Sequence, residues 1–176
     1  MNAEKAKQLT NPKKLQKILR SDKEDIALAA LENPICSDEE RRIAVEESPL
    51  RSVRESAAIA LSDSDFVAKA YQKKLDKWRG FSQYDFEQIG VEPGTSGGNV
   101  LIAYRYASLY KIQIEAWAVL SRLGLSFLEE LKNLRRDLYD PNSKAYKQLI
   151  VSQTFGGGFS EKLDISLDTE IAKLES

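Results

Sequence analysis

The chain has 176 residues, of which 42% are hydrophobic and 30% are charged, and its formal net charge is −1. This length and composition are typical of a globular protein with one domain or two small ones. The sequence contains no histidine and a single cysteine, Cys36. Mechanisms that need a histidine base or a histidine nucleophile partner are therefore excluded, as are a disulfide within the chain and a metal site built from several cysteines.

The first 23 residues carry a local charge of +5, most of it from lysine. A basic start of this kind can be an organelle transit peptide, but those peptides are rich in arginine and serine, and this segment is not. No run of residues reaches the ~20 apolar positions that would cross a bilayer. We therefore expect a cytoplasmic protein with no membrane partner, in which Asn11 caps a helix that begins at Pro12.

Three more short helices are predicted before residue 63, each bounded by local signals. Asp22 is expected to cap the second helix, and Asn33-Pro34 ends it. Ser37 begins the third, with Glu40 three residues later as its capping-box partner, and Ser48-Pro49 ends that helix. The fourth ends near residue 62. Alanine is frequent in these helices, which favours close packing between neighbours.

The second and fourth helices align at an offset of 27 residues, with Ile26 matching Val53 and Ala30 matching Ala57. The pattern of an apolar residue, an arginine and then alanines, seen in Val53-Arg54 with its following alanines, resembles the HEAT-like and leucine-rich-variant helical repeats. The resemblance covers residues 11–62. It implies stacked helical hairpins whose surface binds other macromolecules. It carries over no cysteine cluster, because Cys36 stands alone.

Longer helices are predicted after residue 64. One covers residues 65–79, a glycine-rich loop covers residues 90–99, and a nearly all-apolar helix runs from Val100 to Leu123. Such a helix is expected at the centre of a bundle, with Tyr110 and Trp117 inside. Its polar residues form one narrow stripe, which we expect to face water: Ser108, Lys111, Glu115 and Arg122. Ser126 and Glu129 suggest a capping box for the next helix, and a last helix is expected over residues 143–153.

The last part of the chain has a different pattern. After three consecutive glycines at 156–158, Leu163, Ile165 and Leu167 alternate with polar residues, which is the period of a β-strand. These three apolar side chains are candidates for partner binding. The tail would lie along the bundle as an extended strap or would bind a partner as a peptide, and the sequence leaves both possibilities open.

Together these patterns predict an all-α fold in which a short N-terminal helical-repeat stack packs on a C-terminal helical bundle with an extended tail. The predicted parts are residues 1–63, 64–154 and 155–176. No catalytic, cofactor or metal site is predicted. The glycine runs lack the lysine of a phosphate-binding loop, and the acidic run at 38–40 suits the first turn of a helix.

We therefore expect a non-enzymatic protein–protein interaction module, such as an adaptor, an inhibitor or a small subunit of a larger assembly, with another protein as its partner. The alternative is a nucleic-acid-associated subunit that uses basic faces at 69–79 and 132–136. An enzyme based on carboxylates with a metal, or on lysine, is a third possibility. The candidate binding residues on the two basic faces are Lys73, Lys74, Lys77, Arg135 and Arg136.

Overall fold

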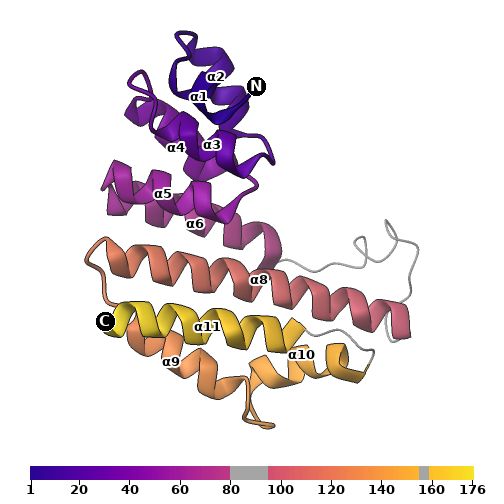
Figure 1. Cartoon of the computed structure of the whole chain (residues 1–176). Helices are drawn as coiled ribbons and strands as arrows, with labels where there is room; N and C mark the ends of the chain where they lie inside the picture. The colour runs from indigo at the N-terminus through magenta and orange to yellow at the C-terminus, as the bar shows by residue number, and fades with distance from the viewer. Residues whose placement is uncertain (80–94, 155–158) are drawn as a thin grey trace. The chain divides into compact units, whose positions relative to one another are not determined.

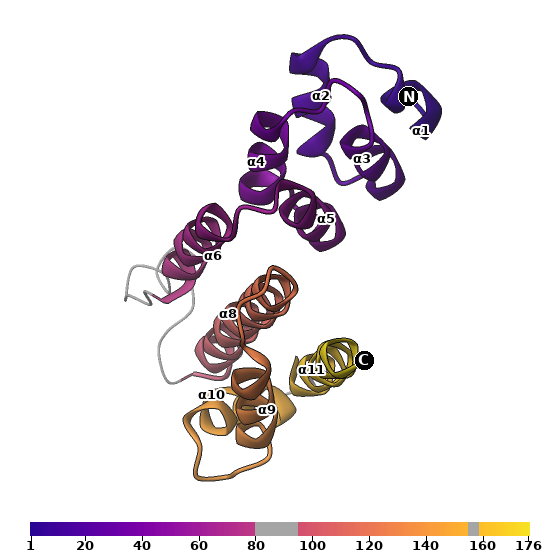
Figure 2. The same ribbon diagram turned by 90° about the vertical axis from the view of Figure 1, so that its left-hand side faces the viewer.

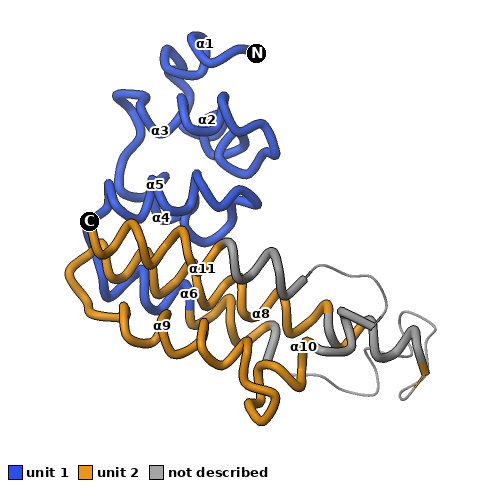
Figure 3. The backbone as a smooth tube through the Cα atoms, turned by 60° about the horizontal axis from the view of Figure 1, so that its bottom comes forward, with its two compact units in different colours: residues 1–71 blue, residues 72–176 orange. Residues whose placement is uncertain are grey.

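The computed structural model describes residues 1–79, 95–154 and 159–176. These residues form ten α-helices and no β-strand (Figure 1), so the predicted all-α class is confirmed. The chain divides into two compact units, unit 1 with residues 1–71 and unit 2 with residues 72–176 (Figure 3). The predicted division into three parts at residues 63 and 154 stays a prediction.

Unit 1 consists of short helices, three of which begin at a constant spacing. They are α1 (Ala3–Lys7), α2 (Pro12–Leu19), α3 (Glu24–Leu31), α4 (Asp38–Glu47), α5 (Arg51–Leu61) and the first half of α6 (Ser64–Arg79). Helices α2, α4 and α6 begin at residues 12, 38 and 64, a spacing of 26 residues. Helix α2 packs on α4, and α3 packs on α5 (Figure 2). Helices equivalent in the sequence are therefore neighbours in space.

A side-chain cap sets the start of each of the three regularly spaced helices. Asn11 Oδ1 accepts from the Lys14 amide at 3.2 Å, and Asp63 Oδ1 accepts from the Phe66 amide at 3.0 Å. Ser37 and Glu40 form the predicted capping box. Each cap satisfies an amide that the first helical turn leaves without a partner. The start of α3 differs from the prediction, because it follows residue 23 with no side-chain cap, and Asp22 does not cap it.

The core of unit 1 is built largely from alanines, which let short helices approach closely. The fully or nearly fully buried hydrophobic members are Ala6, Leu15, Leu19, Ala27, Ala29, Ala30, Cys36, Ala44, Val45, Val53, Ala57, Ala58, Val67, Ala70 and Tyr71. Asn33 is also buried, at 3% exposure. Its side-chain amide donates to the carbonyl oxygens of Ala6 at 2.7 Å and Leu9 at 3.1 Å. This side chain ties the turn after α3 to the end of α1.

In unit 2, helix α8 (Ser96–Arg122) contacts α9 (Leu128–Asp137), α10 (Lys144–Thr154) and α11 (Phe159–Glu175). The predicted central helix at 100–123 is therefore present. Because α8 begins at Ser96, the expected loop at 90–99 is wrong at its end, and the rest of it lies outside the described residues, as does the short element expected from residue 82. One hydrophobic cluster joins the four helices: Ala107, Ile114, Leu131, Leu134, Leu138, Ala145, Leu149 and Leu167.

The predicted polar stripe on α8 is wrong at Glu115, which is only 3% exposed. Helices pack around α8 on several sides, so a position that looks polar in the sequence is covered in the fold. Tyr110 and Trp117 are partly buried against the core cluster. The Tyr110 hydroxyl donates to Gln148 Oε1 at 2.6 Å, and burial raises the pKa of Tyr110 to about 12. The predicted interior position of Tyr110 and Trp117 holds only in part, because both side chains are partly exposed.

The start of α9 also differs from the prediction. Helix α8 ends at Arg122, and Gly124 follows with a φ of +92°, which only glycine adopts easily. The Leu125 amide donates to the Leu120 carbonyl at 3.0 Å. The chain then enters α9 at Leu128, after Phe127, with no side-chain cap. The capping box expected from Ser126 is therefore not formed.

The predicted extended tail is wrong, because the structure has a helix there. Residues 159–175 form helix α11, and the strand period holds only from Leu163 to Leu167. Over a longer stretch the apolar positions fall at Leu163, Leu167, Ile171 and Leu174, which is helical spacing. Leu167 is fully buried, and Ile171 and Leu174 pack against the same core. A helix satisfies its own backbone groups, so the tail needs no neighbouring strand.

Ala57 tests whether the small residues of unit 1 are needed for close packing. Its side chain is fully buried on α5, so Ala57→Leu overpacks the contact and is expected to lower the free energy of unfolding by about 1–3 kcal/mol. Ala60→Leu on the exposed side of the same helix is the control, because leucine and alanine are both good helix formers. Equal denaturant midpoints for the two variants would contradict the packing described here.

Glu40 is expected to make unit 1 sensitive to acid. Burial alone would raise the pKa of Glu40, but hydrogen bonds from Ser37 and Gln16 outweigh it and lower the pKa below the ordinary value. The charged form is thus favoured in the fold. Its contribution to the free energy of unfolding is complete above the ordinary glutamate pKa of about 4.3 and is lost as the pH falls through the lowered value.

Chemical denaturation at a series of pH values measures this contribution. Glu40→Gln keeps a side chain that can complete the capping box but removes the titrating group, so the acid-induced loss of stability should be smaller in this variant. Glu39→Gln, at an exposed position in the same turn, is the control and should follow the parent protein. A Glu40→Gln variant with the same pH dependence as the parent would show that the group does not act in this way.

Candidate functional site

Helix α11 is fastened to two other helices by charged side chains. Glu170 is 3% exposed and accepts hydrogen bonds from Arg122 of α8 and, at 3.1 Å, from Lys173. Arg135 of α9 pairs with Asp168, and Lys132 of α9 pairs with Glu175 at 2.8 Å. A carboxylate as buried as Glu170 is stable only when it is paired and hydrogen-bonded. These pairs fix which side of α11 faces α9.

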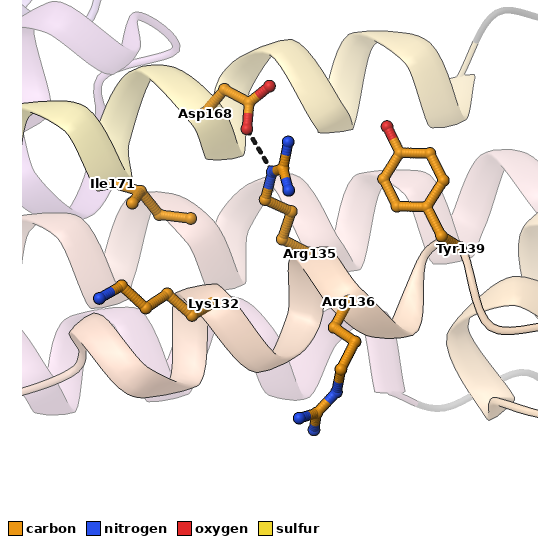
Figure 4. Close-up of a pocket in the computed structure, with 6 residues that line it drawn as sticks. All are labelled: Lys132, Arg135, Arg136, Tyr139, Asp168 and Ile171. Carbon is orange, nitrogen blue, oxygen red and sulfur yellow. Dashed lines mark hydrogen bonds and ion pairs between the residues drawn. The ribbon is translucent and has the colours of Figure 1, made fainter.

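A groove runs between α9 and α11, with a volume of about 530 Å³ (Figure 4). It is lined by Lys132, Arg135 and Arg136 of α9, Tyr139 just after that helix, and Asp168 and Ile171 of α11. Three cations and one carboxylate line the groove, so the lining residues carry a net positive charge. Glu175 and Asp137, which are outside the lining, pair with Lys132 and Arg136. The chain as a whole has a net charge of −1, and the groove therefore stands out as a surface suited to an anionic partner.

The sequence of α9 places these residues on one side of the helix. Lys132, Arg135, Arg136 and Tyr139 follow one another at steps of three, one and three residues, which keeps them on one face. Three leucines lie on the opposite face and are buried in the core: Leu131, Leu134 and Leu138. Burial of the leucine face thus directs the cations outward, and Asp168 and Ile171, three residues apart on α11, complete the groove from the other side.

The three cations of the groove differ in how closely they pair with carboxylates. Arg135 pairs with Asp168, and Lys132 approaches Glu129 at 3.7 Å as well as Glu175, whose hydrogen bond is the main reason for its raised pKa. For Arg136, the one ion pair in the described structure is with its neighbour Asp137, at 4.0 Å. The Arg136 side chain is 74% exposed, and Figure 4 shows its guanidinium turned away from the Arg135–Asp168 pair.

Of the candidate residues from the sequence, Arg135 and Arg136 lie in the groove. Leu167 does not, because it is a core residue and is not accessible to a partner. The side chains of Leu163 and Ile165 lie outside the described residues, although their backbone belongs to α11. The lysines of α6 do not line the groove: Lys73 and Lys77 are exposed, and Lys74 is half-buried.

Three residues of the groove were missed by the sequence analysis. Tyr139 could have been found, because it lies three residues after Arg136 on the same face. Asp168 and Ile171 could not, because their place on α11 depends on a helix that the strand period concealed.

The groove contains few kinds of titratable group. Its titratable groups are three cations, a tyrosine and a carboxylate that is held by an arginine. In the described ranges, no three acidic, cysteine or histidine side chains are placed to hold a metal ion. Among the helices that the structure describes, none has the length and apolar character needed to cross a membrane. Compared with models of protein families, with curated proteins and with solved structures, the chain matches none of them. The resemblance to HEAT-like repeats stays a prediction.

The burial of Leu167 provides a test of whether α11 is part of the folded unit. Leu167→Ala removes a fully buried side chain and is expected to lower the free energy of unfolding by about 2–5 kcal/mol. Leu125→Ala removes the same atoms at a position that is 43% exposed and should cost much less. Thermal or chemical unfolding gives both values. A Leu167→Ala variant as stable as Leu125→Ala would mean that α11 does not pack on the core.

Proposed function

We propose that this protein is a non-enzymatic protein-binding module, and that its α9–α11 groove binds an acidic segment of a partner protein. The observation that carries the proposal is the exposure of Arg136 and Tyr139, which line the same groove as the partly buried Ile171. Arg136 is 74% exposed, and Tyr139 is 60% exposed. Arginine and tyrosine are among the residue types that contribute most to protein–protein binding.

The composition of the groove favours a protein over a nucleic acid at this face. The lining combines a partly buried isoleucine with an exposed tyrosine and an exposed arginine, residue types that are enriched in protein interfaces or suit their apolar part. Two of the three cations already pair with carboxylates of α11, which leaves Arg136 for an anionic partner. One cation can meet a carboxylate of a peptide, whereas a nucleic acid backbone needs several cations along its phosphates. A nucleic acid bound through residues 69–79 and 132–136 is therefore the weaker alternative.

The size of the groove indicates what part of a partner it can hold. A stable interface between two folded proteins buries about 800 Å² on each side, which needs a larger surface than six residues. A groove of this kind suits a short segment, with carboxylates of the segment near Arg136 and an apolar side chain near Ile171. Recognition of one segment in this way fits an adaptor, an inhibitor or a small subunit of an assembly.

Site-specific photo-crosslinking in the cell of origin tests this proposal directly. A photo-reactive phenylalanine analogue replaces Tyr139 in the groove or, as a control, Tyr104, which is 50% exposed on α8 and does not line the groove. Mass spectrometry identifies the captured peptides. We expect acidic segments at position 139 that are absent at position 104. Adding Arg136→Glu should reduce their yield by roughly tenfold, because it reverses the charge that attracts them.

Any of three outcomes would contradict the proposal. The first is that the captured segments are neutral or basic, the second is that the two positions capture the same proteins, and the third is that Arg136→Glu leaves the yield unchanged. Capture of nucleic acid at position 139 would contradict it as well and would favour the alternative.

A further inference from the structure

Helix α2 carries a lysine face on unit 1 that the groove on unit 2 does not involve. Lys13, Lys14 and Lys17 are exposed, and Leu15 and Leu19 on the other side of the helix are fully buried. On a helical wheel the lysines are centred opposite the two leucines. Lys13 and Lys17 are four positions apart, which is about 6 Å of helix axis. We call these three residues the α2 lysine face.

The cations of this face are left unneutralised, whereas the cations beside it are paired. Lys7 pairs with Glu32 at 2.6 Å, and Arg20 pairs with Glu47 at 2.5 Å. In the part of the chain that the structure describes, no carboxylate forms an ion pair with Lys13, Lys14 or Lys17. The surrounding segment of residues 1–23 has a local charge of +5, and residues 24–63 have a charge of −6. Positive charge is thus concentrated in the first part of the sequence of unit 1.

We propose that the α2 lysine face binds the phosphate backbone of a nucleic acid without reading its bases. Phosphates along one strand of a duplex advance by about 3.4 Å of axis, so three lysines spread over ~6 Å can each face a separate phosphate. Lysine acts as a point charge toward phosphate, which suits contact that does not depend on sequence. This proposal is independent of the groove, because it uses other residues on the other unit.

The composition of the face argues against two other anionic partners, namely a membrane surface and an acidic protein. A membrane surface binds an amphipathic helix through its apolar side, but Leu15 and Leu19 of α2 are fully buried inside unit 1. Protein interfaces are enriched in aromatic residues and arginine and depleted in lysine. The α2 lysine face contains lysines and no aromatic residue, the reverse of the α9–α11 groove.

Binding of the full-length chain to a fluorescently labelled DNA duplex of arbitrary sequence tests the proposal, with anisotropy measured over a range of salt concentrations. The test variant carries Lys13→Glu, Lys14→Glu and Lys17→Glu. The matched control carries Lys111→Glu, Lys144→Glu and Lys147→Glu, which makes the same change in net charge at exposed positions of unit 2. Circular dichroism and melting confirm that both variants remain folded.

We expect the parent to bind the duplex, and the α2 variant to bind roughly tenfold or more weakly at low salt, because three phosphate contacts are lost. The plot of log affinity against log salt should become shallower by about 2–3 in that variant, since each phosphate contact contributes about 0.9. The control should retain the parent's slope, and a duplex of different sequence should bind equally well.

Several results would overturn the proposal. One is that the parent does not bind the duplex. Another is that the two triple variants lose the same amount of affinity for it, and a third is a strong preference for one base sequence. Binding to vesicles of anionic lipid that is tighter than binding to the duplex and is lost with the same lysines would instead identify a membrane surface as the partner.

Discussion

The buried carboxylate of Glu170 is the group on which the architecture of unit 2 depends most. It lies 3% exposed beside the fully buried Leu167, and it is hydrogen-bonded to Arg122 of α8. A buried charge without its partner is strongly destabilising, so α11 cannot rotate or slide without losing this pair. With Leu167 and Glu170 held against the core, Asp168 and Ile171 must face α9. The groove is therefore a consequence of how α11 is fastened.

Unit 1 meets a different constraint, because its helices are too short to be stable alone. Helices of eight to eleven residues gain most of their stability by burying one face against neighbours, and alanines allow that contact at short range. Side-chain caps at residues 11, 37 and 63 set the 26-residue spacing that brings equivalent helices together. The outward face of α2 consists of exposed lysines, whereas the groove of unit 2 exposes arginine and tyrosine. The two surfaces differ in composition, and we assign them to different kinds of partner.

Local signals were the most reliable part of the sequence analysis. Asn11-Pro12 and the Ser37–Glu40 box were located correctly because each cap is formed by residues three positions apart. Asp22 and Ser126 are residue types that commonly cap helices, but neither does so here, because α3 starts after Lys23 and α9 after Phe127. The strand expected at 163–167 was wrong, because a period of two over five residues cannot outweigh the helical spacing of the whole segment. The burial of Glu170 and the groove itself depend on contacts such as Arg122–Glu170 and Arg135–Asp168, which join residues far apart in the sequence and leave no local signal.

Native-state hydrogen exchange of the amides of α11 tests most directly whether this helix is a fixed wall of the groove. Amides buried in a cooperative core open only with the unit as a whole, whereas those of a loosely attached helix open on their own. We predict that the amides of residues 167–174 exchange within about tenfold of those of residues 131–138 in α9. Exchange of the α11 amides near the rate of an unfolded peptide, while those of α8 and α9 stay protected, would contradict the account.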